Sequence, residues 1–490
     1  MIPTFNHTYQ NFINGQWVTS RSKKTFTSIN PANEKVLGKF QASNNQDVEQ
    51  AVQAASNALP AWKNIPAPER AHYLTTIKEL LKKNKQRLGT LIATEMGKIM
   101  KEALGDVQEA IDIFDYMAGE GRRLYGRTTP SELQNKTCYT QRKPYGIAGI
   151  ITPWNFPLAI PAWKIAPALI TGNTIVWKPS SDTPLCALEL VELLHEAGLP
   201  KGVINLITGS GEDVGIPLIK HTKINVVSFT GHRDTGTTIL REAGIKKVGL
   251  ELGGKNAIIV MEDADLALAV DGILWGGYGT TGQRCTATSR IIAHQTISKE
   301  LQEKLVKNIT KLRLGPGTKT TTDVGPLINK AAQEKAEEYT NIGIKEGATL
   351  TCGGNKPKGK GYYYQPTLFT NVKPTMRIAQ EEIFGPIVSL LTVKDLAEAI
   401  NVCNNIDYGL SAAIYTKNIN QAFQAINQLE TGIIYVNAPT IGAEVHLPFG
   451  GTKKTGFTRE AGWTGIEEFS EEQTIYIDYS ERLQKAQGID

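Results

Sequence analysis

The chain has few cysteines and no paired ones. Its 490 residues include five cysteines, and no two of them form a Cys-x-x-Cys pair. This pattern indicates neither a disulfide framework nor a cysteine zinc site, and we expect no bound metal. The first twenty residues lack a basic start followed by a long apolar stretch, so no secretory signal is expected. These absences predict a protein of the reducing cytoplasm.

Long apolar runs and basic tracts are also missing. The most apolar region, residues 147–179, is interrupted by prolines, an asparagine and a lysine, which leave pieces too short to cross a bilayer. The net charge of +5 is spread along the chain, so neither a membrane nor a nucleic-acid partner is expected. With 41% hydrophobic and 21% charged residues, the composition is that of a globular protein.

Alternating strand and helix patterns dominate the chain after residue 145. Helical apolar spacing fills residues 51–125. Short apolar strands then alternate with amphipathic helices, two of which end at Gly172 and Gly198. A second round of alternation begins near Asn256. The pattern predicts an α/β fold with two doubly wound parallel sheets, in a chain long enough for two or three domains.

Two polar segments, residues 128–146 and 470–490, belong to neither predicted sheet. Both have the composition of solvated strands. Exposed strand edges attract other strands unless something pairs with them. We therefore expect these segments to form an oligomer contact.

Cys285 lies in the stretch TTGQRCTATS. A free cysteine is usually a small buried hydrophobe, and the other four cysteines have no local mark of reactivity. Next to Cys285, however, Gly282 permits close approach of the backbone, Arg284 adds positive charge, and small residues leave room around the sulfur. This setting favours a nucleophile.

Several other polar or glycine-rich segments stand at the ends of predicted strands, where doubly wound proteins collect their active groups. Glycine loops at residues 208–215 and 230–236 are either phosphate-binding loops or plain turns. Glu251 follows apolar residues, which would raise the pKa of its carboxyl group toward the range useful for a general base. Asn155 is an amide donor or a turn residue, and Lys178 is a ligand-binding or an exposed lysine.

Several short stretches follow one another along the chain in this order: PWNFP, WKPS, FTG, LELGGKN, GQRCTA, EEIFGP and PFGG. Through these stretches the chain resembles the aldehyde dehydrogenase superfamily. The resemblance covers nearly the whole chain. It implies two Rossmann-like α/β domains and a small β oligomerisation arm. The cofactor-binding domain would be residues 1–127 and 147–254, the catalytic domain 255–455, and the arm 128–146 and 470–490. The implied assembly is a homodimer or homotetramer.

The resemblance also implies the chemistry. The Cys285 thiolate adds to an aldehyde, the Asn155 amide and the Cys285 backbone N–H hold the oxyanion, and loss of hydride leaves a thioester. Glu251 then activates the water that releases a carboxylic acid. Lys164 completes the implied catalytic set.

The implied cofactor is NAD or NADP. The residues assigned to its site are Ile151, Pro153, Trp154, Lys178, Ser181, Gly211, Gly215, Phe229, Thr230, Gly231, Leu252, Glu382 and Phe384. NAD-preferring relatives carry a glutamate where this chain has Ser181, and its absence removes a charge that would repel a 2′-phosphate. We therefore expect NADP to be tolerated or preferred.

The stretches TIGAEVHLPFGGTKKTG and GQRCTATSR are most similar to members of the superfamily that act on a carboxylated semialdehyde, such as succinate semialdehyde or 2-oxoglutarate semialdehyde. The expected pocket wall consists of Trp163, Arg284, Ile441, His446 and Phe449. Arg284 either meets the substrate acid or forms a structural ion pair, and both alternatives stay open.

Three other functions remain alternatives at this point. In a coenzyme A-acylating enzyme the acyl group would leave by transfer, although Glu251 argues for hydrolysis. A non-catalytic nucleotide-binding protein would not need Cys285, Glu251 and Asn155 together. A cysteine hydrolase would need a histidine partner, and no histidine lies in a suitable motif.

Overall fold

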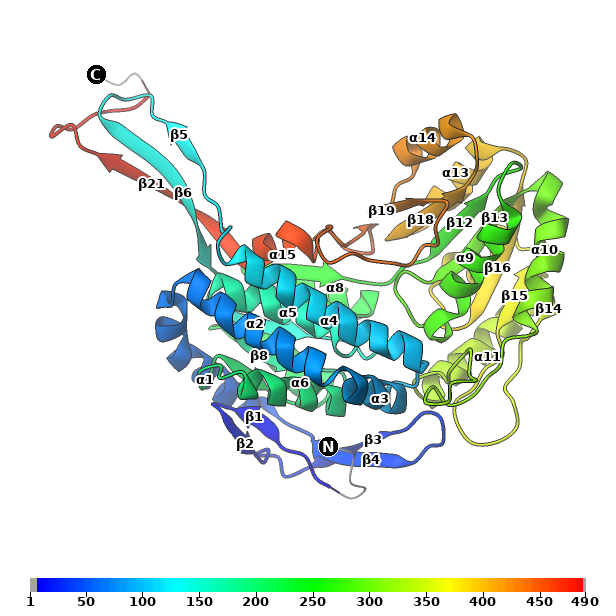
Figure 1. Ribbon diagram of the computed structural model, residues 1–490, viewed down its shortest axis with the longest axis horizontal. Helices are drawn as coiled ribbons and strands as arrows, with labels where there is room; N and C mark the ends of the chain where they lie inside the picture. The colour runs from blue at the N-terminus through cyan, green and yellow to red at the C-terminus, as the bar shows by residue number, and fades with distance from the viewer. Residues whose placement is uncertain (1–6, 488–490) are drawn as a thin grey trace.

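The structure is a computed structural model that describes residues 7–487. The outer ends of the predicted cofactor-binding domain and arm, residues 1–6 and 488–490, lie outside the described residues. Figure 1 shows two lobes side by side and an arm that projects from the first lobe. Each lobe is built around one seven-stranded sheet.

The sheet of the first lobe has the order β11-β10-β7-β8-β9-β1-β2. Its parallel strands are β7 (Ile147–Ile151), β8 (Thr174–Lys178), β9 (Ile204–Leu206), β10 (Val226–Thr230) and β11 (Lys247–Glu251). The antiparallel strands β1 (Asn11–Ile13) and β2 (Gln16–Val18) extend it at one edge. β7 to β10 are buried along their whole length, as expected for a parallel sheet covered on both faces.

Alternate residues of β7 face two different helical layers. Ala148 and Ile150 join the core under one layer, whereas Ile147 and Ile151 join the core on the opposite face. The first layer contains α2 (Ala67–Lys83), α3 (Lys85–Glu95), α4 (Met100–Glu120), α5 (Ala159–Thr171) and α6 (Pro184–Glu196). The second contains α1 (Asn45–Asn64), α7 (Ile216–Lys220) and α8 (Arg233–Glu242).

The predicted helix stop at Gly172 is confirmed. Gly172 follows α5 with a φ of 99°, in the left-handed region that glycine adopts without a Cβ penalty. This turn leads directly into β8.

The sheet of the second lobe has the order β14-β15-β16-β13-β12-β18-β19. Its strands are β12 (Asn256–Val260), β13 (Thr288–His294), β14 (Thr349–Cys352), β15 (Thr367–Thr370), β16 (Ile387–Val393), β18 (Ser411–Tyr415) and β19 (Ile433–Val436), and only β14 is antiparallel to its neighbour. Helices α9 (Leu266–Tyr278) and α10 (Gln295–Ile309) pack on one face. Helices α11 (Lys330–Lys345), α12 (Arg377–Gln380), α13 (Leu396–Asn404) and α14 (Ile419–Gln428) pack on the other. The prediction of two parallel-rich α/β sheets is confirmed.

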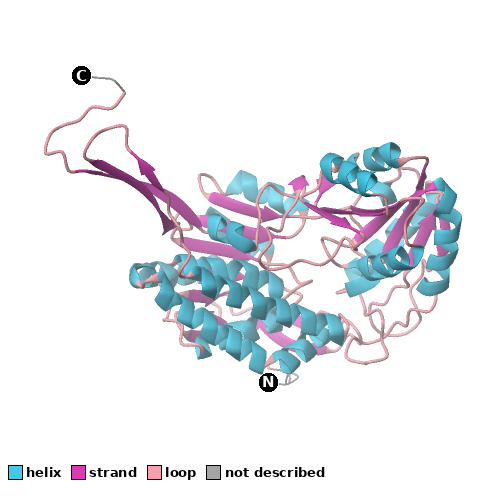
Figure 2. Ribbon diagram, turned by 45° about the horizontal axis from the view of Figure 1, so that its top comes forward, coloured by secondary structure: helices cyan, strands magenta, loops and turns pink. Residues whose placement is uncertain are grey.

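The arm is a three-stranded antiparallel sheet of β5 (Thr128–Pro130), β6 (Lys136–Pro144) and β21 (Ser470–Asp478). β6 and β21 pair over nine residues, from Pro144 with Ser470 to Lys136 with Asp478. Figure 2 shows this sheet extending away from both lobes. Tyr476 on β21 and Tyr479 in the loop that follows are 69% and 60% exposed, which is unusual for aromatic side chains.

The chain returns to the first lobe before it enters the arm. Leu252 N–H donates to the carbonyl oxygen of Thr455 at 2.8 Å, and Leu250 N–H donates to Thr458 Oγ1 at 2.9 Å. The short helix α15 (Gly462–Glu468) then packs against α5. The segment after residue 449 therefore connects the lobes and brings side chains of late sequence position to the end of β11.

Within residues 7–487, no helix is both long enough and apolar enough to cross a membrane. The same residues include no group of three or more His, Cys, Asp or Glu side chains arranged to hold a metal ion.

Candidate active site

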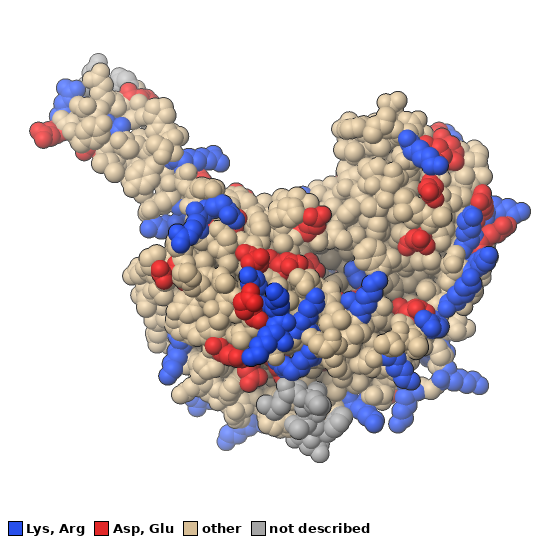
Figure 3. Space-filling view, viewed as in Figure 1, with Lys and Arg blue, Asp and Glu red and all other residues tan. Residues whose placement is uncertain are grey.

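A cavity of about 710 Å³ is lined by residues of both lobes. α4 and α5 of the first lobe form one wall, and α9 and the segment around Cys285 form another. Glu251 lines it together with the neighbouring Arg284 and Cys285, which follow much later in the sequence. Figure 3 shows the surface hollowed between the arm and the second lobe, with positive and negative side chains mixed on this face.

A tight turn aims Cys285 at the cavity. The turn at Gly279–Gly282 contains Thr280 and Thr281 with φ values of 51° and 59°. Such backbone costs about 1–3 kcal/mol per residue and needs external support. Thr280 N–H donates to Glu102 Oε1 at 2.8 Å, and the Thr281 hydroxyl donates to a backbone carbonyl at 3.0 Å.

Gly282 is required at the end of this turn. A Cβ on Gly282 would lie 2.3 Å from the carbonyl oxygen of Gly385, and the φ of 68° disfavours other residues. The close backbone approach that we inferred for Gly282 is thus present.

The surroundings of Cys285 favour the protonated thiol. Burial is the largest of the causes that raise its pKa to about 12; the nearby carboxylates of Glu251 and Glu382 act in the same direction, and the backbone N–H of Thr286 opposes them. Arg284, which precedes Cys285, pairs with Glu102 at 3.4 Å and is not among the groups that lower the pKa of the sulfur. Formation of the thiolate therefore needs a cation or a base brought close to the sulfur.

Glu251 lies at the end of β11 and is 3% exposed. Neither of its carboxylate oxygens has a hydrogen-bond partner among the described residues. Burial raises its pKa well above the ordinary value, and the neighbouring Glu460 raises it further, whereas Lys164 opposes the shift. An unpaired buried carboxyl beside a thiol is suited to proton transfer.

Lys164 of α5 is the cation of a buried cluster of carboxyl groups. Its Nζ donates to Ser228 Oγ at 2.8 Å and pairs with Glu460. Burial raises the pKa of Glu468, another member of this cluster, to about 7, with Lys164 opposing. Glu460 also lines the cavity, although no local motif marked it. Only the return of the chain to the first lobe brings it there.

Asn155 follows β7 and is 3% exposed. Its Nδ2 donates one hydrogen bond to the carbonyl oxygen of Gln283 at 3.1 Å, two residues before Cys285. A side-chain amide has two N–H donors, so the second is free for an oxygen near the sulfur. The same hydrogen bond ties the first lobe to the cysteine segment.

A second group of polar residues gathers at the carboxyl ends of β8 and β9. The side chain of Lys178 is buried, and its Nζ donates to the carbonyl oxygen of Pro179 at 2.9 Å. Burial lowers its pKa to about 8, opposed by Asp182. The Ser181 hydroxyl donates to Gly209 O at 3.1 Å, and a Cβ on Gly211 would meet nothing within 4 Å. These features leave open space beside a buried ammonium.

Glu382 and Phe384 approach from the second lobe. Glu382 accepts a hydrogen bond from Gly254 N–H at 2.8 Å, and burial raises its pKa. Phe384, with a φ of 60°, contacts Trp154 edge to face at 5.5 Å between ring centroids. Both lobes therefore border this second region as well as the cavity.

Comparison with known proteins identifies the family. Residues 17–475 match the model of the aldehyde dehydrogenase family. The chain belongs to this family.

The family members most similar in sequence include two semialdehyde dehydrogenases. The alpha-ketoglutarate semialdehyde dehydrogenase of Haloferax volcanii is 42% identical over 96% of this chain and 99% of that relative. The alpha-ketoglutaric semialdehyde dehydrogenase of Bacillus subtilis is 40% identical over 97% and 99%. A crystal structure of betaine aldehyde dehydrogenase from Staphylococcus aureus, in complex with NAD+, has a TM-score of 0.95 at 36% identity and covers 97% of this chain and 95% of that chain.

The remaining predicted site residues of this aldehyde dehydrogenase divide into two groups. The first group was assigned to the cofactor. Its members lie at or just after the ends of the first-lobe strands, or in the glycine loops that follow them: Ile151, Pro153, Gly215, Phe229, Thr230, Gly231 and Leu252. Among the expected pocket residues, Trp163 and Phe449 line the cavity and contact each other edge to face at 4.9 Å.

Two expected pocket residues do not line the cavity. Ile441 is 2% exposed and packed into the interior, whereas the His446 side chain is 52% exposed and lies 3.6 Å from Glu444. The neighbouring Gly442 and Ala443 form the wall instead. The sequence indicated the correct loop but not which of its residues face inward.

Proposed function

We propose that this aldehyde dehydrogenase oxidises a carboxylated semialdehyde to the acid with NAD or NADP. The observation that carries this proposal is the convergence of Cys285, Glu251 and Arg284 on one cavity, with the Asn155 amide beside the cysteine segment. The first two supply a nucleophile and a base, and Arg284 supplies a cation for the substrate carboxylate.

Cys285 acts first in the proposed reaction. Its thiol releases its proton to water in the cavity, and the sulfur adds to the aldehyde carbon, which gives a tetrahedral alkoxide. The free N–H of Asn155 and the backbone N–H of Cys285 hold this oxyanion. NAD or NADP would supply the hydride acceptor when bound, and loss of hydride from the same carbon would leave a thioester on Cys285.

Glu251 acts second. Its unpaired carboxylate accepts a proton from a water molecule, which attacks the thioester and releases the carboxylic acid. Lys164 acts through its neighbours, because its positive charge offsets Glu460 and Glu468 and so limits the rise in the pKa of Glu251. A hydrolytic base at this position argues against transfer of the acyl group to coenzyme A.

The region near Lys178 fits a dinucleotide. Among residues 7–487, the buried ammonium of Lys178 has only a backbone carbonyl as its hydrogen-bond partner and would hold a ribose hydroxyl. Ser181 brings no charge against a 2′-phosphate, which favours tolerance of NADP. Asp182, however, places a carboxyl group near Lys178, and a negative charge there would disfavour the 2′-phosphate of NADP. On the other side, Glu382 would hold the second ribose, and Phe384 would support the ring.

Arg284 supports the choice of substrate. Its guanidinium uses Nε for Thr280 Oγ1 at 2.9 Å and one Nη for Glu102. Five N–H donors are available on a guanidinium, so others remain for a substrate carboxylate. The two ideas about Arg284 are compatible: it forms an ion pair and also lines the cavity. The names of the similar semialdehyde dehydrogenases agree with this assignment.

One experiment tests the proposal. The protein is incubated with NAD or NADP and a panel of short aldehydes, with and without a carboxylate, and reduced nicotinamide is followed by absorbance. We expect carboxylated semialdehydes to have the highest kcat/KM and the Cys285→Ala variant to be inactive. Full activity of that variant, or no reduced cofactor with any aldehyde, would refute the proposal.

We further infer that the first lobe is the cofactor-binding domain, the second the catalytic domain, and the β5–β6–β21 sheet an oligomerisation arm in a homodimer or homotetramer. The exposed aromatic side chains of β21 and its following loop support a role in association. A cytoplasmic location remains the expectation from the cysteine content.

A further inference from the structure

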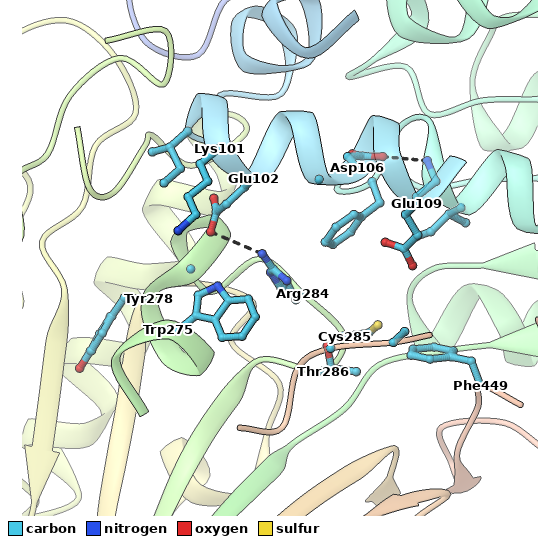
Figure 4. A pocket seen from close by; sticks show the side chains of 18 of the residues that line it. Lys101, Glu102, Asp106, Glu109, Trp275, Tyr278, Arg284, Cys285, Thr286 and Phe449 are labelled. Carbon is cyan, nitrogen blue, oxygen red and sulfur yellow. Dashed lines mark hydrogen bonds and ion pairs between the residues drawn. The ribbon is translucent and has the colours of Figure 1, made fainter. Parts of the chain in front are cut away.

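The cavity is lined by several carboxyl groups that the proposed reaction does not use, and Glu109 is one of them. Figure 4 shows Glu109 pointing from α4 into the cavity that contains Cys285. In the part of the chain that the structure describes, its carboxyl has no hydrogen bond and no ion pair. Two other acidic residues of α4 have ion-pair partners: Asp106 pairs with buried Lys98 at 3.0 Å, and Glu102 pairs with Arg284. Glu109 is therefore available to whatever enters.

The surroundings of Glu109 favour its neutral form near pH 7. Burial is the largest of the causes that raise its pKa to about 8, and the charge of Asp106 acts in the same direction. Arg284 and Lys98 oppose this shift, and Asp112 adds to it. A protonated carboxyl has one O–H donor. The cavity thus offers a hydrogen-bond donor at Glu109 in addition to the cation at Arg284.

We propose that Glu109 determines specificity by donating a hydrogen bond to the 2-oxo group of a 2-oxo semialdehyde. This inference rests on the proposed function and narrows its substrate class. Such a substrate has the aldehyde at one end, and a ketone next to a carboxylate at the other. With the aldehyde at Cys285 and the carboxylate at Arg284, the ketone oxygen needs a donor from the same wall.

This side of the cavity also has an unpartnered donor at Trp163 Nε1 on α5, but Glu109 shares helix α4 with Glu102, the partner of Arg284. Phe156, Ile160 and Leu274 line the cavity and have no polar side-chain atom. A ketone buried against them without a donor would lose its hydrogen bonds to water. The charge of Arg284 acts on the Glu109 carboxyl, and both side chains line the same cavity.

The test compares two aldehydes that differ only in the ketone, 2,5-dioxopentanoate and 5-oxopentanoate. In Glu109→Leu, we expect kcat/KM for 2,5-dioxopentanoate to fall roughly three- to tenfold more than for 5-oxopentanoate, the value of one neutral hydrogen bond. Glu109→Gln should keep the native ratio, because its amide N–H replaces the O–H donor. The control is Asp115→Asn, an exposed residue of α4 paired with Lys78, which should change neither value.

The pH dependence of this ratio gives a second readout. In the native protein, the preference for 2,5-dioxopentanoate should decrease as pH rises through about 8, because Glu109 loses its proton, and in Glu109→Gln it should stay constant. Titration of Cys285 and Glu251 affects both aldehydes alike and cancels in the ratio.

Two results would overturn the inference while leaving the proposed function intact. One is an equal loss of kcat/KM for both aldehydes in Glu109→Leu, and the other is a native ratio that does not change with pH. If the native protein oxidises other aldehydes but neither of these two, the proposed substrate class is itself wrong, and the role of Glu109 fails with it.

Discussion

Replacing Glu251 by glutamine should separate the two halves of the reaction. Glutamine has nearly the same shape but cannot accept a proton from water. Neither oxygen of Glu251 has a hydrogen-bond partner, so the substitution breaks no contact, and it removes the repulsion from Glu460. We therefore expect the free energy of unfolding to stay the same or increase, and the change in activity to report on chemistry alone.

The magnitude follows from the role of a general base, which contributes about 10²–10⁴ to a rate. Steady-state turnover of Glu251→Gln should fall by that factor, while one equivalent of reduced nicotinamide still forms in a rapid first phase. Mass spectrometry of the quenched protein should find the acyl group on Cys285. Native turnover should increase as pH rises through the raised pKa of Glu251, because only the carboxylate accepts a proton, and the variant should lose this dependence.

Cys285→Ala is the control, because it should give neither the rapid phase nor the adduct. If Glu251→Gln shows slow turnover without an acyl adduct, then acylation is the impaired step and the assignment of Glu251 to thioester hydrolysis is wrong. Undiminished turnover would refute the role altogether.

Three further variants test other contacts. Asn155→Ala removes an oxyanion donor and should cost ~2.7–4 kcal/mol of barrier, about 10²–10³ in kcat, and an unchanged kcat would exclude this role. Ser181→Glu should weaken use of NADP more than use of NAD, measured as the ratio of the two kcat/KM values; an unchanged ratio would remove the charge argument. Lys98→Met leaves Asp106 as an unpaired buried carboxylate and should lower the free energy of unfolding in urea by about 3–5 kcal/mol, whereas adding Asp106→Asn should recover most of it. No recovery in the double variant would show that the loss has another origin.

Much of the fold could be predicted because its signals are local. Apolar strands such as Ile147–Ile151 and the glycine after α5 have their character within a few residues. The same holds for the motif around Cys285, where Gly282 marks a close approach of backbone. The strands β14 and β15 were not predicted, since their short, half-polar sequences lack a clear period.

The sequence by itself determined two α/β sheets and the family, and it predicted Cys285 as the nucleophile and Glu251 as its base. Only the tertiary structure decided which charges act on them. Glu460 reaches Lys164 from 296 residues away, Glu102 holds Arg284, and Glu109 faces the cavity without a partner. His446 shows the converse, because a suitable residue in the right loop points outward. The physical reason is that pKa values and ion pairs depend on burial and on distance through space, and both arise only when the two lobes pack together.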